Sequence, residues 1–153
     1  MLPAPDRRLT PAENARHAVE LFGRDVVVDR CEELLSGIAT DNDPRYPDIA
    51  WLKGHINWPA HWSRVWGARG LLHIGPPARP TLVVDALTDD AWRVREMVLK
   101  VIARHEFDDP SERVAERLED PVERVRQQAM RAPGIPPSAR NAHERREGKA
   151  IPN

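Results

Sequence analysis

The sequence predicts an all-α protein built from stacked helix pairs, and three observations support this. Apolar residues recur at steps of three and four, as at Val94, Val98, Val101 and Ile102. Strand signals are scarce, because no Asn-Gly or Asp-Gly turn separates alternating apolar runs. Finally, the pattern of helices returns at a fixed spacing of 31 residues.

Three short segments mark helix starts with one shared pattern. They are TPAE at 10–13, DPSE at 109–112 and DPVE at 120–123. In each, a capping side chain (Thr10, Asp109 or Asp120) precedes a proline at the first helical position. A glutamate at the third helical position then reaches back to the cap. Glycine is expected to end two early helices, at Gly23 and Gly37.

These signals and the apolar spacing predict eight helices. The expected ranges are 11–22, 25–36, 46–56, 59–74, 78–88, 91–105, 110–119 and 121–132. When the sequence is shifted by 31 residues, two apolar and two basic columns align. The columns are Leu52/Val83/Val114, Ile56/Leu87/Leu118, Arg64/Arg95/Arg126 and Arg69/Lys100/Arg131. Such a return predicts a stacked array, because one helix pair cannot bury its apolar face alone.

The segments DDAWRVREMVLKVIARH (89–105) and DPVERVRQQAMRA (120–132) resemble the HEAT-repeat family, in the short-period form of phycobilin-lyase-like HEAT proteins. The whole chain also resembles small actinobacterial-type HEAT-repeat proteins. The resemblance implies a right-handed α-α superhelix, a HEAT-like solenoid of about four helix pairs. It also implies that an aspartate and an arginine join neighbouring repeats, here Asp89 with Arg95 and Asp120 with Arg126. Trp58 stands where the 46–75 repeat should have its aspartate, which leaves the partner of Arg64 open.

The expected domain is a solenoid over 10–132. It divides into a cap pair at 11–38 and repeats at 46–75, 77–106 and 109–132. Residues 1–9 are expected to be disordered, and so is most of the tail at 133–153, which is polar and proline-rich. We expect part of the tail to cover the open end of the last repeat.

Basic residues concentrate on the second helix of each repeat. They are Arg64, Arg69, Arg93, Arg95, Lys100, Arg104, Arg124, Arg126 and Arg131, against only Glu96 and Glu123 as acids. In HEAT-like solenoids the second helices line the concave side, so the resemblance implies a basic concave face. Helical geometry places Trp62, Arg93 and Arg124 in one exposed row and Arg69, Lys100 and Arg131 in another. These six residues are the candidate partner-binding site, and a merely solvated charged face is the alternative.

Tryptophan is concentrated in one part of the chain, with four of the five tryptophans within residues 51–66. Trp51 aligns with Leu82 and Trp66 with Met97, which predicts that both pack in the core. Trp62 aligns with Arg93 and Arg124 on the polar row, which makes it the best candidate for an exposed aromatic contact. Two glycines inside the same helix, Gly67 and Gly70, favour close approach of a neighbouring backbone, with access for a ligand as the alternative.

Composition excludes several classes of site. The formal net charge is −1, so no global field attracts nucleic acid or an anionic membrane. The single cysteine, Cys31, excludes an intrachain disulfide and is expected to be a small buried side chain in a reducing compartment. No apolar run has the length of a membrane span, and the N-terminus lacks a signal-peptide core, so we expect a cytoplasmic protein without membrane contact. Histidine spacing indicates no metal site, and no cofactor motif is present.

The sequence therefore predicts a non-catalytic scaffold that binds an acidic protein or peptide through a basic, tryptophan-edged concave face. The alternative is binding of nucleic-acid phosphates through the same face. A more remote possibility is activity like that of HEAT-like glycosylases that remove alkylated DNA bases, for which Glu96 is the only carboxylate on the central row. The oligomeric state stays open.

Overall fold

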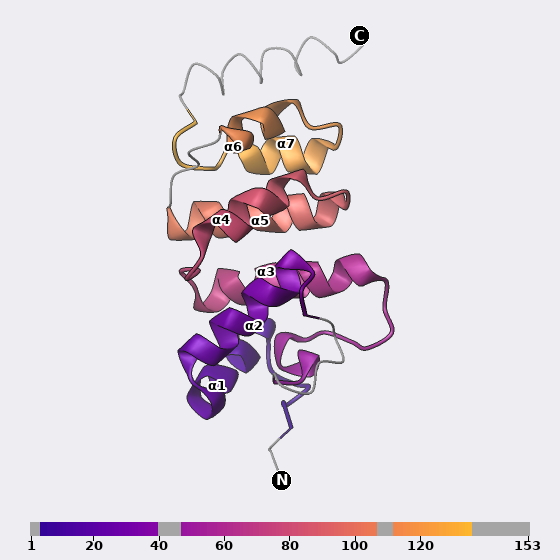
Figure 1. Ribbon diagram of the computed structural model, residues 1–153, viewed down its shortest axis with the longest axis vertical. Helices are drawn as coiled ribbons and strands as arrows, with labels where there is room; N and C mark the ends of the chain where they lie inside the picture. The colour runs from indigo at the N-terminus through magenta and orange to yellow at the C-terminus, as the bar shows by residue number, and fades with distance from the viewer. Residues whose placement is uncertain (1–3, 40–46, 107–111, 136–153) are drawn as a thin grey trace.

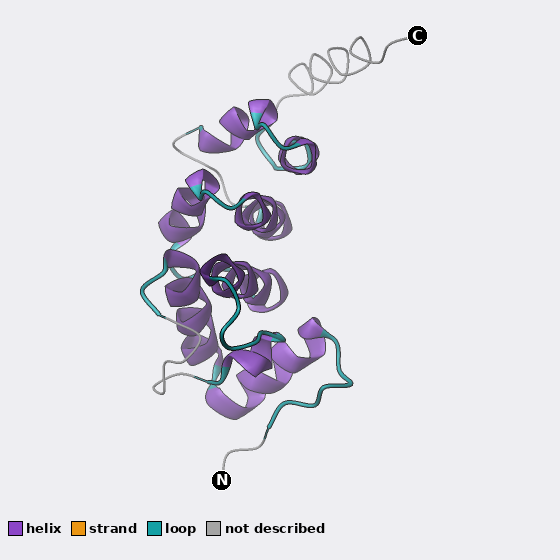
Figure 2. Cartoon of the chain, turned by 90° about the vertical axis from the view of Figure 1, so that its right-hand side faces the viewer, coloured by secondary structure: helices purple, strands orange, loops and turns teal. Residues whose placement is uncertain are grey.

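The computed structural model describes residues 4–39, 47–106 and 112–135. Within these ranges the chain forms seven α-helices and three short 3₁₀ turns, with no strand, as the sequence predicts. The helices are stacked along the long axis of the molecule (Figure 1). From the side, the column α3, α5, α7 lies beside the column α2, α4, α6 (Figure 2), and α5 packs between α3 and α7.

The first two helices are α1 (Pro11–Phe22) and α2 (Arg24–Ser36). The predicted capping box of α1 is confirmed: the Glu13 N–H donates to Thr10 Oγ1 at 3.2 Å, and the Thr10 N–H donates to Glu13 Oε2 at 2.8 Å. Gly23 and Gly37 follow the two helices with φ of 89° and 82°, the conformation for which glycine was expected.

The prediction of a helix over 46–56 is wrong for residues 47–56, the part of this segment that the structure describes. The chain makes only the 3₁₀ turn η1 (Ile49–Leu52), which Lys53 ends with a φ of 61°. A β-carbon at Gly54 would lie 2.5 Å from the Trp66 ring, so the chain after η1 packs directly on α3. The helix that packs along α3 (Ala60–Ile74) is instead α2.

The last two repeats share two backbone features, the step from a first helix into a 3₁₀ turn and the start of the second helix. α4 (Pro80–Asp85) runs into the 3₁₀ turn η2 (Ala86–Thr88), and α6 (Arg113–Glu116) runs into η3 (Arg117–Glu119), 31 residues later. The second helices, α5 (Trp92–His105) and α7 (Glu123–Ala129), also begin 31 residues apart. The sequence period is therefore a backbone period over this part of the chain.

Asp120 was predicted to cap the last helix directly, which is wrong. α7 begins at Glu123, after Val122, and the Asp120 carboxylate is shared among other donors. It accepts from Arg95 Nε at 2.8 Å, from Arg117 Nη1 at 3.0 Å and from the Val122 N–H at 3.0 Å. Asp109, the other predicted aspartate cap, lies outside the described residues.

Arginine–aspartate pairs join the repeats. Arg64 Nε donates to Asp89 Oδ2 at 2.7 Å, and 31 residues later Arg95 makes the same contact with Asp120. Arg95 and Arg126 also donate to the backbone carbonyls of Asp89 and Asp120, at 2.8 Å each. Arg95 and Arg126 therefore each hold the backbone six residues before them, and Arg64 and Arg95 also bind the aspartate of the following repeat. Trp58 does not deprive Arg64 of a partner, because Asp89 supplies one.

Small residues let α2 approach α3. A β-carbon at Gly67 would lie 2.6 Å from the Cys31 carbonyl oxygen, so the close backbone approach predicted for this helix is present. Cys31 is fully buried, and burial raises the pKa of its thiol to about 12, so this thiol stays protonated and inert.

Of the N-terminal segment expected to be disordered, residues 4–9 are described: the Asp6 and Arg7 carbonyls accept hydrogen bonds from Asn14 and Lys53. Most of the C-terminal tail, from 136 on, lies outside the described residues.

Candidate binding surface on α3, α5 and α7

The first predicted row forms a tryptophan–arginine ladder, made of Trp62, Arg93, Trp92 and Arg124. The Arg93 guanidinium carbon lies 5.4 Å from the centre of the Trp62 ring and 4.4 Å from that of Trp92. The Arg124 guanidinium carbon lies 5.5 Å from the Trp92 ring. These distances are within the range of cation–π attraction. Because α5 packs between α3 and α7, the ladder connects all three helices.

Trp92 was missed in the sequence, although it links the ladder. It is the first residue of α5 and directly precedes Arg93. At the positions 31 residues away stand His61 and Glu123, so the repeat alignment shows no aromatic column there. The signal that could have found it is local: an indole beside an arginine at a helix start.

Glu96 holds two of the basic side chains. Its Oε1 lies 2.9 Å from Arg124 Nη2 and 3.8 Å from Lys100 Nζ. This carboxylate, considered above for a glycosylase-like reaction, is only 13% exposed and is occupied by both cations. With Lys100, Arg124 and Arg131 it lines a shallow pocket of about 230 Å³, completed by Gln127 and Gln128.

Arg69 does not share this pocket. Its Nη2 donates to the Leu52 carbonyl at 2.7 Å, and burial lowers the pKa of its guanidinium. Lys100 and Arg131 stand at the equivalent helical positions and line the pocket described above. The predicted row of Arg69, Lys100 and Arg131 is therefore divided, because η1 offers Arg69 a backbone acceptor.

An aromatic cluster borders the ladder at the start of α3. His55 stacks on Trp58 with ring centres 4.6 Å apart, and Trp58 meets Trp62 edge to face at 5.8 Å. Trp66 packs beneath them and is buried, as predicted, as is Trp51. Trp58 is 48% exposed and is thus the most accessible indole of this cluster, where the sequence favoured Trp62.

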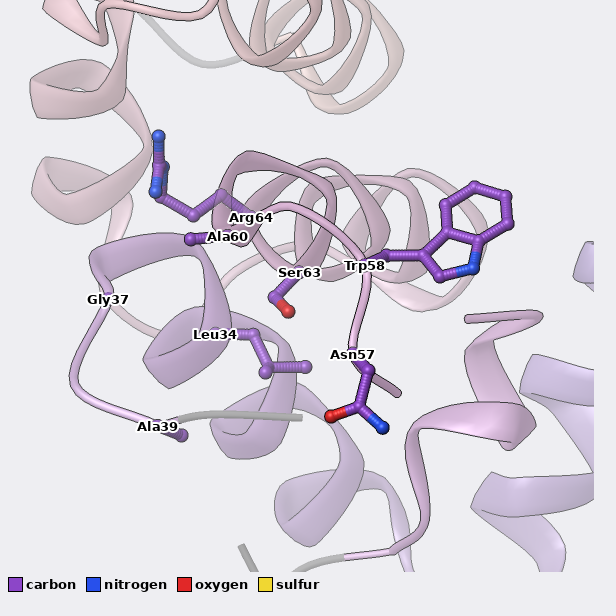
Figure 3. Close-up of a pocket in the computed structure, with 8 residues that line it drawn as sticks. All are labelled: Leu34, Gly37, Ala39, Asn57, Trp58, Ala60, Ser63 and Arg64. Carbon is purple, nitrogen blue, oxygen red and sulfur yellow. The ribbon is translucent and has the colours of Figure 1, made fainter. Parts of the chain in front are cut away.

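A pocket of about 270 Å³ opens on the other side of Trp58 (Figure 3). Leu34, Gly37 and Ala39 form one wall, from α2 and the turn after it, and Ser63 and Arg64 of α3 form another. Arg64 is already paired with Asp89. Among the described residues that line this pocket, Arg64 is the only ionisable side chain, so these residues offer an apolar wall next to the aromatic cluster and not a reactive centre.

Among the residues that the structure describes, no group of three or more histidine, cysteine, aspartate or glutamate side chains could hold a metal ion. None of the helices in the described part of the chain is long and apolar enough to cross a membrane. Comparison with protein-family models, with curated proteins and with solved structures finds no match.

Proposed function

We propose that this chain is a non-catalytic HEAT-like scaffold of the cytoplasm, a right-handed superhelix that binds an acidic segment of a partner protein on α3, α5 and α7. The 31-residue return of the backbone from η2 to η3, and the packing of α5 between α3 and α7, support a solenoid. The buried Cys31 is compatible with a reducing compartment.

The observation that carries the proposal is the position of Arg93 between two indole rings. Arg93 is exposed and makes no ion pair with any residue that the structure describes. Stacking on Trp62 and Trp92 restrains the flat guanidinium and leaves its N–H edge available. A restrained guanidinium loses less entropy when it binds a carboxylate through two parallel hydrogen bonds. The ladder therefore offers a preorganised carboxylate receptor.

Nucleic-acid binding through the same surface is the competing function. Proteins that hold single strands stack bases on exposed aromatic faces. Here Arg93 lies over both Trp62 and Trp92, and Arg124 lies over Trp92 as well. A base stacked on either ring would have to displace these guanidiniums, whereas a carboxylate can bind the edge of Arg93 without moving it. The Arg124 guanidinium is already held by Glu96. The geometry accordingly favours an acidic peptide.

Fluorescence anisotropy with a labelled oligoglutamate peptide tests the proposal, with a single-stranded DNA of equal charge as the competing probe. Arg93→Glu should weaken peptide binding about tenfold or more, because it replaces a bidentate donor with a repelling charge. Arg7→Glu is the matched control, since Arg7 is also exposed but lies outside the ladder. Equal binding by the two variants would contradict the proposal. Tighter binding of the DNA, falling steeply between about 50 and 200 mM salt, would replace it with nucleic-acid binding.

A further inference from the structure

The shallow pocket beside the ladder is lined by polar side chains alone among the described residues, and we call it the polar pocket. It has a volume of about 230 Å³ and lies where α5 packs against α7. Its lining side chains are Glu96 and Lys100 of α5, Arg124, Gln127 and Gln128 of α7, and Arg131 just after α7. Three positive side chains against one carboxylate give the polar pocket a formal charge of +2.

This positive charge is only partly neutralised within the protein. Oε1 of the one carboxylate, Glu96, lies 2.9 Å from Arg124 Nη2 but 3.8 Å from Lys100 Nζ, which is beyond hydrogen-bond distance. Arg131 is exposed, and its side chain makes no ion pair or hydrogen bond with any residue that the structure describes. Lys100 and Arg131 therefore have donors available to a ligand.

A buried amide is a second, independent feature of the polar pocket. Gln128 is only 8% exposed, and its side-chain amide makes no hydrogen bond with any residue in the described part of the chain. A buried amide without a partner is unfavourable, so native proteins nearly always supply one, from the protein, from water or from a ligand. Gln127 differs, because its Nε2 donates to Glu123 Oε1 at 3.2 Å. Gln128 thus offers an N–H donor to an occupant of the pocket.

The polar pocket is continuous with the ladder. Arg124 belongs to both, since its guanidinium lies over Trp92 and is paired with Glu96. On α5, Arg93 and Lys100 are separated by close to two helical turns, so they lie on one face, about 10 Å apart along the helix axis. An extended peptide covers this distance in about three residues. One partner segment can therefore reach Arg93 and the polar pocket together.

We propose that the polar pocket binds a phosphate monoester, carried by a phosphorylated serine or threonine of the partner about three residues from the carboxylate that Arg93 binds, so that the inference rests on the proposed function. A phosphate monoester carries close to two negative charges and three acceptor oxygens. It thus matches the formal charge of +2 and the donors of Lys100, Arg131 and Gln128. A carboxylate carries a single charge and would leave part of the pocket's positive charge uncompensated.

Inorganic phosphate tests the polar pocket without a partner and without the ladder. The side-chain amide signal of Gln128 is followed by NMR in sodium phosphate and in sodium chloride of equal ionic strength, with Gln128→Ala assigning the signal. Phosphate should shift this signal to saturation, and Arg131→Gln should weaken the affinity about tenfold, because it removes a charged donor. Arg93→Gln and Arg7→Gln, which change exposed arginines outside the pocket, should leave the affinity unchanged. An unmoved Gln128 signal, or equal affinity in Arg131→Gln and Arg7→Gln, would overturn the inference.

A pair of peptides identifies the class of anion. One contains a single glutamate and a phosphoserine at the spacing inferred above, and the other has glutamate in place of the phosphoserine. The phosphopeptide should bind about tenfold more tightly, and Arg131→Gln should abolish that preference. Arg93→Gln should weaken both peptides and keep the preference, so failure of the ladder and failure of the polar pocket are distinguishable.

The spacing gives a sharper control. When the phosphoserine directly follows the glutamate, the preference should disappear, because neighbouring residues span only about 3–4 Å. Equal affinity for the two peptides, a preference that persists at the shorter spacing, or tighter binding of single-stranded DNA of equal charge would rule out a phosphate-monoester site in the polar pocket.

Discussion

Residues 77–106 and residues 47–60 belong to neighbouring repeats in the sequence but behave differently in the fold. The first segment contains α4, η2 and α5. The same order of elements returns about 31 residues later as α6, η3 and α7. In the second segment, the expected helix is replaced by η1 and a turn that packs against Trp66. The stack continues because α2 packs along α3.

The comparison shows what defines a repeat in this molecule. The regular interfaces are held by arginine–aspartate pairs, Arg64 with Asp89 and Arg95 with Asp120. The irregular segment has tryptophan at the aspartate position and is held by indole packing. That change also exposes Trp58 and gives the candidate binding surface its aromatic edge. The departure from the repeat thus accounts for the aromatic edge of the surface, whereas Trp92, Arg93 and Arg124 of the ladder come from the regular repeats.

The largest loss of stability is expected from Asp120→Ala, which removes the arginine–aspartate pair between two regular repeats. Asp120 is 1% exposed and its removal leaves Arg95, itself 7% exposed, without its carboxylate. We expect a loss of about 3–5 kcal/mol of unfolding free energy, measured by urea denaturation. Asp85→Ala is the control, because its pair with Arg113 is exposed, with Asp85 65% exposed, and should cost about 1 kcal/mol or less. Similar losses in both variants would contradict a special role for the repeat-joining pair.

The same residue gives a pH dependence. Burial alone would raise the pKa of Asp120, but hydrogen bonds from Arg95 and the Val122 N–H outweigh it and lower the pKa. A lowered folded pKa stabilises the fold above the unfolded value near 3.8, and that stability is lost as the pH falls through the folded pKa. The unfolding free energy of Asp120→Asn should therefore fall less steeply below about pH 4 than that of the wild type.

A smaller loss is expected from Gly54→Ala in the irregular segment. The added methyl group would lie 2.5 Å from the Trp66 ring and 2.6 Å from Ile49, both of them buried. Overpacking of this kind costs about 1–3 kcal/mol, visible as a lower melting temperature. An unchanged melting temperature would show that residues 47–60 do not pack tightly against α3.

His73→Gln should give the smallest effect. The lowered pKa of His73 means that the folded chain holds this proton less tightly than the unfolded chain does. The wild type should lose stability as the pH falls from about 6.5 toward the folded pKa, and the variant should lack this slope. An identical pH profile would indicate that burial and the charges of Arg69, Arg104 and Arg16 do not lower the pKa of His73.

The regular half of the fold was predictable because its cause is local and periodic. The cap at Thr10 and the burial of Cys31, Trp51 and Trp66 follow from spacing and residue type. The failures have tertiary causes. The turn at Gly54 packs on Trp66, twelve residues away in sequence. The Asp120 carboxylate binds Arg95 as well as the Val122 N–H, and α7 begins only at Glu123. Neither contact can be seen in a window of sequence.

In the candidate site, too, the periodic features were predictable and the features with tertiary causes were not. Periodicity identified Arg93 and Arg124 as neighbours, because residues 31 apart occupy equivalent helical positions. It missed Trp92, which has no aromatic equivalent in the other repeats, and it could not foresee that η1 draws Arg69 away from Lys100.

The most direct test of the central claim is the affinity of an oligoglutamate peptide for Arg93→Lys. Lysine keeps the charge but lacks the flat, forked guanidinium that Trp62 and Trp92 hold in place. If this stacked arginine is the receptor, binding should weaken about tenfold, nearly as much as in Arg93→Gln. Wild-type affinity in Arg93→Lys would contradict the account, because a positive charge at position 93 would then be enough to explain binding.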